Sequence, residues 1–267
     1  DGLEFCKAVR QAVLAGKEVV FYKAGRTPEG KDATSGHTAS LAGDYMVCES
    51  CVRQAGAIVA RTFTEFQELF LLAERLGTKK INGNRLSAVS GAGFEAVGMA
   101  DSIQSDDYQI RLASFSRSTR EDIDRILRNK KLESLVSIGN PLDINPAADD
   151  ETHAAIAAAL LKDEGVDAVI MGLDPLSPAM HTLSDTLVEE YSMHADKGIV
   201  PLLTQVAAQT DKPIIGVVDG GRLFDPLRDA LLAAGVPIFP VCDRAVAATA
   251  LYIEARLHAE AIRQTNA

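Results

Sequence analysis

The spacing of apolar residues predicts alternating helices and strands along the whole chain. In the first third, apolar positions three and four residues apart predict three helices, and short apolar runs predict two buried strands. The helices span about residues 3–15, 44–55 and 63–76, and the strands span 18–22 and 57–59. Two strands are fewer than a complete doubly wound domain contains. We therefore expect residues 1–83 to be the C-terminal half of an α/β domain whose first half precedes Asp1.

A complete α/β series is predicted after a polar, turn-prone linker at 78–84. The strands of this series are expected at 85–90, 108–113, 166–173, 213–219 and 237–240. The helices that alternate with them are expected at about 92–104, 119–129, 150–162, 198–209 and 225–234, with a closing helix at 243–262. Such alternation predicts a parallel sheet with right-handed crossovers in a flavodoxin-like arrangement, spanning 84–267.

Composition and charge narrow the classes of function. The formal charge of −10 and the lack of a basic run argue against binding to nucleic acid or to an acidic membrane surface. No apolar run approaches the ~20 residues of a membrane span. Four cysteines in 267 residues do not form a disulfide framework, which favours the cytoplasm. The chain starts with Asp1-Gly2-Leu3 inside a helical pattern, so we expect it to be a piece of a longer polypeptide.

The most reactive side chain is expected in the segment from Lys23 to Asp44, which follows the first strand. It contains four glycines, one proline and five Ser/Thr residues, with His37 near the middle. Gly36 and Thr38 leave the imidazole uncrowded, and the glycines predict a mobile loop. A histidine in this setting can act as a base, a metal ligand or a nucleophile. Lys23 and Arg26, at the end of the preceding strand, could pair with phosphate or be solvated surface charges.

Two further turns are candidate binding sites at the carboxyl end of the second sheet. Ser90-Gly91-Ala92-Gly93 leads from a strand directly into a helix, where free backbone N–H groups and the helix dipole would bind an anion such as a phosphoryl group. The alternative is a tight turn whose glycines serve packing only, since the motif lacks the lysine of a P-loop. Asn140-Pro141-Leu142-Asp143 is either a polar site turn or a capped structural turn.

The order of these pieces resembles that of the NDP-forming acyl-CoA synthetases, the relatives of succinyl-CoA synthetase and of ADP-forming acetyl-CoA synthetase. The resemblance is carried by Lys-x-Gly-Arg at 23–26, His-Thr-Ala-Ser-Leu-Ala-Gly at 37–43, the helix start at 90–93 and Asn-Pro-Leu-Asp at 140–143. It implies two succinyl-CoA-ligase-like flavodoxin domains, divided at 83/84. Ala92 departs from the family's usual triple glycine and places a methyl group near the anion.

The resemblance also implies an activity and its participants. In this family the histidine that matches His37 is transiently phosphorylated, with Gly36, Thr38, Ser40, Lys23 and Arg26 as supporting residues, and Ser90–Gly93 as a phosphate-binding turn. The reaction converts a carboxylic acid, CoA and ATP reversibly into acyl-CoA, ADP and phosphate. No protein-bound metal and no tightly bound cofactor are implied, and Mg enters with the nucleotide. An ATP-grasp domain or subunit, a CoA-binding domain and an oligomeric assembly are implied as partners.

Two other functions are compatible with the same features. A non-catalytic module could bind CoA or an acyl phosphate and regulate a fused partner, although the intact His37 segment argues against it. A receiver-like phosphoacceptor would need an acidic cluster with a lysine partner. Asp174 and Asp219 follow strands, but no acidic pair follows the strand at 85–90. The acid itself, the choice between ADP and GDP, and the role of residues 174–197 are left open.

Overall fold

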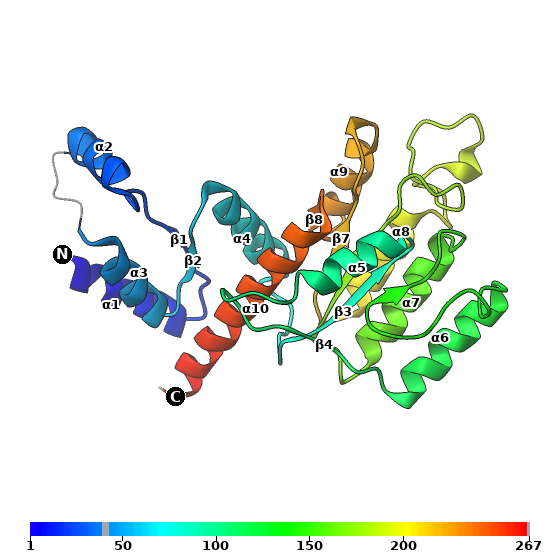
Figure 1. Ribbon diagram of the computed structural model, residues 1–267, viewed down its shortest axis with the longest axis horizontal. Helices are drawn as coiled ribbons and strands as arrows, with labels where there is room; N and C mark the ends of the chain where they lie inside the picture. Colours follow the sequence, from blue (N-terminus) through cyan, green and yellow to red (C-terminus); the bar gives the residue numbers. More distant parts are fainter. Residues whose placement is uncertain (39–42, 266–267) are drawn as a thin grey trace. The chain divides into compact units, whose positions relative to one another are not determined.

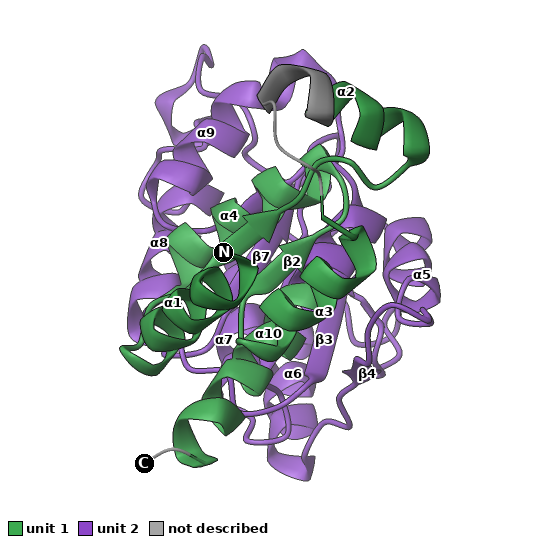
Figure 2. Ribbon diagram, turned by 90° about the vertical axis from the view of Figure 1, so that its left-hand side faces the viewer, with its two compact units in different colours: residues 1–77, 251–267 green, residues 78–250 purple. Residues whose placement is uncertain are grey.

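The computed structural model of the protein describes residues 1–38 and 43–265, and side chains for residues 1–34 and 43–265. Packing divides the chain into two compact units: residues 1–77 with 251–267, and residues 78–250 (Figure 2). The first boundary lies six residues before the predicted one at 83/84. The second boundary, at 250/251, was not predicted. The end of the last helix packs on unit 1, whereas the prediction assigned all of 84–267 to one domain. Among the described residues, no helix combines the length and apolar content that a bilayer crossing requires.

Unit 1 is built on two parallel strands and the helices around them (Figure 1). Its elements are α1 (Gly2–Leu14), β1 (Val20–Tyr22), α2 (Pro28–Thr38), α3 (Tyr45–Gln54), β2 (Ile58–Ala60) and α4 (Phe63–Leu76). Val20 pairs with Ile58 and Tyr22 with Ala60, in parallel register. The buried core joins α1, α3 and β2 to Ala259 and Ile262 of the last helix.

Polar contacts also hold the end of the last helix on unit 1. Arg256 Nη1 lies 2.6 Å from Glu18 Oε1, and the Tyr252 hydroxyl donates to Glu18 Oε2 at 2.9 Å. Arg263 donates from Nε to the Val13 carbonyl oxygen at 3.0 Å. Because these partners come from the two ends of the chain, unit 1 needs both ends to complete its core.

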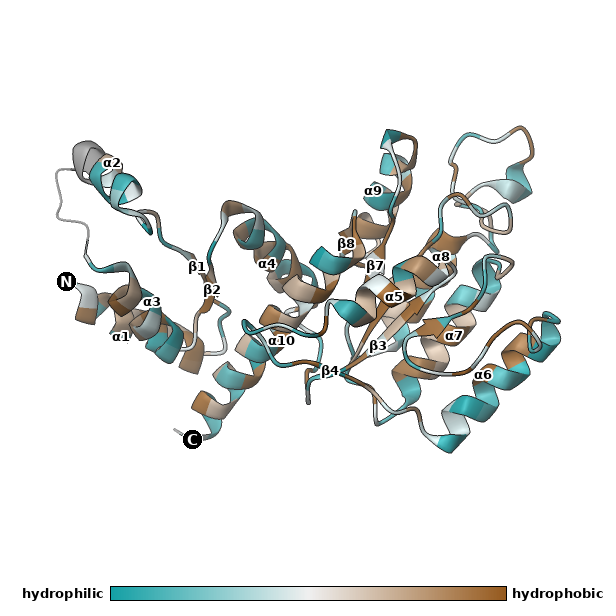
Figure 3. Cartoon of the chain, viewed as in Figure 1, coloured by the Kyte–Doolittle hydropathy of each residue, from teal (hydrophilic) through white to brown (hydrophobic). Residues whose placement is uncertain are grey.

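Unit 2 is a doubly wound α/β domain. Its strands are β3 (Arg85–Ser90), β4 (Arg111–Leu112), β5 (Leu142–Asp143), β6 (Ala168–Gly172), β7 (Ile214–Val217) and β8 (Ile238–Phe239). Its helices are α5 (Gly93–Asp101), α6 (Arg117–Asn129), α7 (Asp150–Lys162), α8 (Ile199–Gln209), α9 (Asp225–Ala233) and the first turns of α10 (Cys242–Thr265), with 3₁₀ turns at Glu189–Tyr191 and Arg222–Phe224. All strands are parallel, and they are more apolar than the helix surfaces that face solvent (Figure 3).

The sheet has the strand order that the flavodoxin-like prediction requires. The path β4-β3-β6-β7-β8 corresponds to the order 2-1-3-4-5, and β5 pairs with β3 beyond the short β4. Helices α6, α7, α8 and α9 share one core with the strands, and α5 lies on the opposite side of the sheet from α8 (Figure 2). The predicted fold class is confirmed. The two-residue β5 was not predicted, because Leu142 and Asp143 follow a proline and are too few to show a period.

The segment before His37 is a helix where the sequence predicted a loop, and the prediction is wrong for residues 28–38. Pro28 occupies the first position of α2, a site that its missing N–H suits. Thr27 starts the helix: its hydroxyl accepts the Gly30 N–H at 3.1 Å and its carbonyl oxygen accepts the Lys31 N–H at 2.8 Å. The signature Thr-Pro-Glu was therefore present, although the Gly and Ser/Thr content of the segment is typical of loops.

Candidate functional site

The carboxyl ends of the parallel strands of unit 2 place several polar residues along one edge of the sheet. Ser90 ends β3, Asp143 ends β5, and Asp174 and Asp219 follow β6 and β7. Ligands of open α/β sheets bind at this edge, where loops and helix N-termini converge. Three features meet there: the turn into α5, the turn before α7, and the long segment after β6.

The turn from Ser90 to Gly93 leaves backbone donors free at the start of α5. The N-cap residue is Ala92, which makes no side-chain cap hydrogen bond, so α5 lacks the usual acceptor for its first N–H groups. The Ser90 hydroxyl accepts the Ala92 N–H at 3.0 Å and donates to Glu95 Oε2 at 2.6 Å. An uncapped helix N-terminus of this kind can bind an anion through its N–H groups and its dipole.

The glycines of this turn make room for titratable side chains as well as for a ligand. A Cβ atom on Gly91 would lie 3.4 Å from His153 Nε2. A Cβ atom on Gly93 would collide with the Asp143 carboxylate, and one on Gly172 of β6 would collide with the Glu95 carboxylate. Larger residues at Gly93 and Gly172 would therefore displace two carboxyl groups, whereas a methyl group at Gly91 would lie in ordinary contact with the His153 ring.

Glu95 is a carboxyl group beside this turn whose pKa its surroundings change strongly. Burial raises its pKa to about 7, the Ser90 hydrogen bond acts in the opposite direction, and the carboxylates of Asp219 and Asp174 raise it further. Because the pKa lies near neutrality, Glu95 can exchange a proton under physiological conditions. Glu95 was not predicted as a site residue, although a carboxylate among the apolar residues Phe94, Ala96 and Val97 was a usable signal.

His153 contributes a buried imidazole on the other side of the same turn. Its Nδ1 lies 3.0 Å from the Asp149 carbonyl oxygen, which can only accept, so Nδ1 carries the proton. Burial lowers the pKa of His153 and favours the neutral ring, whose Nε2 is then an acceptor. Among the described residues this buried Nε2 has no hydrogen-bond partner. The ring is buried because α7 is covered on most sides, where its alanines and leucines are packed.

The predicted turn at 140–143 divides into a structural residue and a site residue. The Asn140 amide accepts the Ala88 N–H at 3.0 Å and donates to the Leu86 and Ala113 carbonyl oxygens at 2.8 and 2.9 Å. It thereby supplies the sheet hydrogen bonds at the point where β4 has ended and β5 has not begun. Asp143, in contrast, lies against Gly93 and accepts the Asn145 N–H at 2.9 Å, so it borders the α5 turn.

The His37 segment belongs to unit 1, and the structure describes part of it. Gly36, His37 and Thr38 lie in the last turn of α2, their side chains lie outside the described set, and Ser40 lies outside the described residues. Lys23 Nζ lies 3.4 Å from the carbonyl oxygens of Ala24 and Gly43, close to both ends of the segment. Lys23 and Arg26 both lie 6.0 Å from the centre of the Tyr45 ring. The predicted roles of these residues stay predictions.

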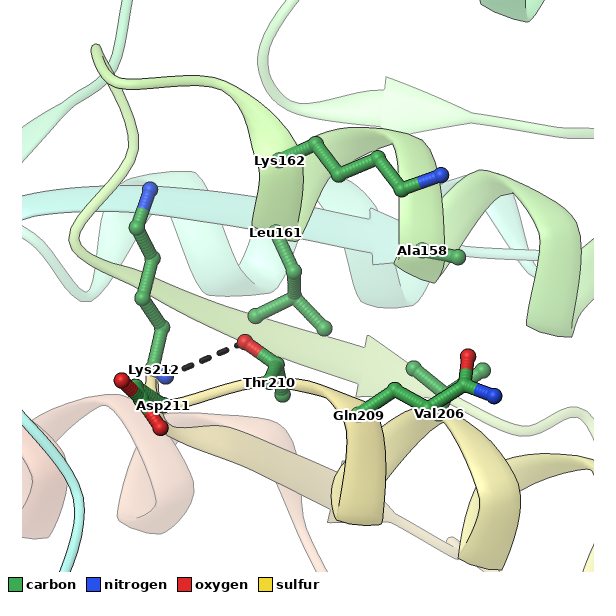
Figure 4. Close-up of a pocket in the computed structure, with 8 residues that line it drawn as sticks. All are labelled: Ala158, Leu161, Lys162, Val206, Gln209, Thr210, Asp211 and Lys212. Atoms are coloured by element: carbon green, nitrogen blue, oxygen red, sulfur yellow. Dashed lines mark hydrogen bonds between the residues drawn. The ribbon is translucent and has the colours of Figure 1, made fainter.

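A pocket at the opposite edge of the sheet, near the amino ends of the strands, is less suited to a ligand. It has a volume of about 340 Å³ and is lined by the ends of α7 and α8 and by Thr210, Asp211 and Lys212 (Figure 4). The Lys212 ammonium donates to the Asp163 carbonyl oxygen at 2.6 Å, and Thr210 caps the Lys212 N–H at 3.0 Å. Its charged groups therefore satisfy the ends of helices. Within the described part of the chain, no group of three or more His, Cys, Asp or Glu side chains is arranged to hold a metal ion.

Comparisons with known proteins agree with the resemblance found in the sequence. Residues 1–73 match the family model of the succinyl-CoA ligase like flavodoxin domain. The chain is 28% identical over 257 residues to the alpha subunit of acetate–CoA ligase (ADP-forming) II of Pyrococcus furiosus, covering 96% of this chain and 51% of that subunit. It is 38% identical over 128 residues to the acetate–CoA ligase (ADP-forming) of Methanocaldococcus jannaschii, covering 48% of this chain and 17% of that enzyme. The chain is thus similar to ADP-forming acetate–CoA ligases and, over residues 1–73, to the flavodoxin domain of succinyl-CoA ligases.

A solved structure supports the fold of the chain over nearly its whole length. It is described as a dinucleotide forming acetyl-coenzyme A synthetase 1 of Ca. Korarchaeum cryptofilum in complex with phosphate and ADP. The TM-score is 0.79 at 24% identity, and the match covers 99% of this chain and 52% of that one. The chain thus spans about half the length of the synthetase subunit and of the solved structure to which it is similar.

Proposed function

We propose that the chain is the phosphoryl-transferring part of an NDP-forming acyl-CoA synthetase. The observation that carries the proposal is the uncapped α5 turn at Ser90–Gly93, with His153 beside it, in a chain related to acetate–CoA ligases over 96% of its length. Such a turn offers fixed N–H donors to a transferring phosphoryl group at no cost of reorganisation. The overall reaction is acid, CoA and ATP to acyl-CoA, ADP and phosphate, in either direction.

In this proposal His37 is the nucleophile that carries the phosphoryl group. A ring nitrogen of His37 attacks the γ-phosphorus of ATP, the bond to the β,γ-bridging oxygen breaks, and ADP leaves. The acid carboxylate then attacks the phosphohistidine to form an acyl phosphate and to restore the imidazole. Finally the CoA thiol attacks the acyl carbon, phosphate leaves at the Ser90–Gly93 turn, and the thiol proton passes to a base. Histidine suits the task because its neutral ring is nucleophilic near pH 7.

The remaining participants are proposed from the family. Lys23, Arg26, Gly36, Thr38 and Ser40 support the phosphohistidine. The nucleotide arrives with Mg at an ATP-grasp domain or subunit, and CoA binds to a CoA-binding domain. Two acidic groups border the turn, Glu95 and Asp143, and their ionised forms would repel a phosphate. Phosphate binding is therefore favoured when Glu95 is neutral.

The test is to label the intact enzyme with γ-³²P-ATP and to map the label. We expect an acid-labile, base-stable label on His37. In His37→Ala we expect both the label and net thioester synthesis to be lost. His258→Ala is the matched control, because His258 is an exposed histidine of the same unit. Label on another residue would reject His37 as the carrier, and full turnover in His37→Ala would favour the regulatory alternative.

A further inference from the structure

A second hollow of unit 2, which we call the His181 pocket, lies in the segment whose role the sequence left open. It has a volume of about 550 Å³ and is lined by residues of 175–191 and by Leu223 and Phe224. The segment follows β6 and leads to α8, and Leu223 and Phe224 follow β7 (Figure 1). The pocket therefore opens at the same edge of the sheet as the Ser90–Gly93 turn.

A buried carboxyl group holds His181 in this pocket. His181 Nδ1 lies 2.8 Å from Asp150 Oδ2, without the alignment of a linear hydrogen bond. The backbone N–H of His181 also donates to both Asp150 oxygens, at 3.1 and 3.3 Å. The Asp150 side chain is 2% exposed and the His181 side chain 28% exposed. Asp150 thus fixes the ring from the buried side, and the Nε2 edge is the part left for a ligand.

Apolar side chains and polar groups both line the pocket, and most of its lining hydroxyls are already used. Leu176, Met180, Leu183 and Phe224 are among the lining residues, and the Tyr191 ring lies 5.7 Å from the His181 ring, centre to centre. Three lining hydroxyls donate to carbonyl oxygens of the chain itself, those of Ser177, Thr182 and Thr186. His181 is consequently the one titratable group among the pocket's lining residues besides the Tyr191 phenol.

The first turns of α7 connect this pocket to the anion-binding turn. Asp150 contacts His181, while His153, three residues later, lies against Gly91. Asp174, where the pocket-forming segment begins, also acts electrostatically on Glu95. A ligand in the His181 pocket would therefore lie on elements that also build the phosphate side of the site.

We propose that the His181 pocket binds the carboxylic acid substrate, with its carboxyl group at His181 and its hydrocarbon or aromatic body against the apolar side chains of the lining, and that the acid is larger than acetate. This inference rests on the proposed function, since the acid is the substrate of that reaction. A nucleotide or the phosphates of CoA fit the pocket poorly, because its lining residues include no Lys or Arg. A volume of about 550 Å³ falls within the range of roughly 300–1,000 Å³ for sites of larger organic ligands.

Calorimetric titration of the 267-residue chain with acetate, butanoate, hexanoate and benzoate tests the proposal without requiring turnover. Each buried methylene should strengthen binding by up to about fourfold. We expect hexanoate and benzoate to bind at least about tenfold more tightly than acetate. His181→Ala should weaken hexanoate binding by about tenfold, the loss typical of one hydrogen bond to a charged group. His194→Gln, an exposed histidine of the same segment that does not line the pocket, should bind like the parent.

A second variant comes from a different segment of the pocket wall. Leu223 is 66% exposed, so Leu223→Asp should fold, and its carboxylate should repel the acid and weaken hexanoate binding. If His181→Ala does not fold, Leu223→Asp decides alone. Equal binding of acetate and hexanoate, or unchanged hexanoate binding in either folded variant, would overturn the proposal.

The labelling of His37 separates this inference from the proposed function. Labelled His37 with no acid bound at the His181 pocket would refute the pocket and leave the function standing. Hexanoate binding that depends on His181, in an enzyme whose His37 takes no label, would keep the pocket as an acid site and refute the phosphohistidine mechanism.

Discussion

Replacing Glu95 by glutamine should stabilise unit 2 at alkaline pH and not at acidic pH. Glu95 occupies the space next to Gly172 and accepts the Ser90 hydroxyl, and burial raises its pKa from 4.5 to about 7. Glutamine has nearly the same shape and keeps an oxygen that can accept from Ser90. It removes only the ionised form, which the buried position disfavours.

The size and sign of the effect follow from the two pKa values. Below pH 4.5 the carboxyl group is protonated in both the folded and the unfolded chain, so Glu95 costs nothing. As the pH rises from 4.5 to about 7, the unfolded chain releases the proton and the folded one retains it, and stability is lost. The difference of about 2.5 in pKa, at about 1.4 kcal/mol per pH unit, sets a ceiling of about 3 kcal/mol above pH 7.

Hydrogen–deuterium exchange at increasing urea concentration, read on peptides from β3 and β6, measures the stability of unit 2 alone. We expect Glu95→Gln to raise the free energy of unfolding by about 1–3 kcal/mol at pH 8 and by little at pH 5. Glu133→Gln, on an exposed side chain of the same unit, is the matched control and should change little at either pH. A gain of equal size at both pH values, or no gain at pH 8, would show that the buried charge is not what glutamine removes.

Three other substitutions test contacts of unit 2. Gly172→Ala should destabilise unit 2 by about 1–3 kcal/mol, because its methyl group would collide with the Glu95 carboxylate, and most of that loss should disappear in a Glu95→Ala background in a double-mutant cycle. Asp167→Asn should cost about 2 kcal/mol in urea unfolding at pH 7, because Arg85 contacts both oxygens of this buried carboxylate at 2.7 and 2.8 Å. Burial acts to raise the pKa of Asp167, but the Arg85 contacts outweigh it and lower the pKa, so the difference between parent and variant should shrink as the pH falls below 4. His153→Leu should weaken the binding of inorganic phosphate about fivefold in a ³¹P NMR titration at pH 8, where the dianion still carries one proton for Nε2; unchanged binding would contradict the acceptor role.

Helices and strands were predicted correctly where the pattern of apolar residues is long enough to show a period. The apolar run at 85–90 became β3 with the same bounds, and the helix expected at 150–162 is α7. The division of α10 between units could not be predicted, because helical spacing identifies an apolar face and not the partner that covers it. Ala259 and Ile262 cover the core of unit 1, about 200 residues back along the chain.

The site was predicted in part for a related reason. Glycines and a serine before a helix are visible in a sequence, so the turn at 90–93 could be proposed as an anion site, and that role stays a prediction. The side chains that fill the space beside those glycines come from other elements, since Asp143 is on β5 and His153 on α7. The topology of the sheet brings these side chains together, and a local sequence pattern carries no information on that topology.

The contacts at the three glycines change what the turn is expected to do. A turn with backbone donors alone would favour the most highly charged phosphate, but Gly93 faces a carboxylate, Gly172 faces Glu95, and Gly91 faces an imidazole whose Nε2 can only accept. Each of these acceptors is satisfied by a ligand that carries a proton and repels one that carries only negative charge. We therefore expect these three groups to make the turn selective for a protonated phosphoryl group. That form is the better leaving group when CoA attacks an acyl phosphate, so its selection would serve the last step of the proposed reaction.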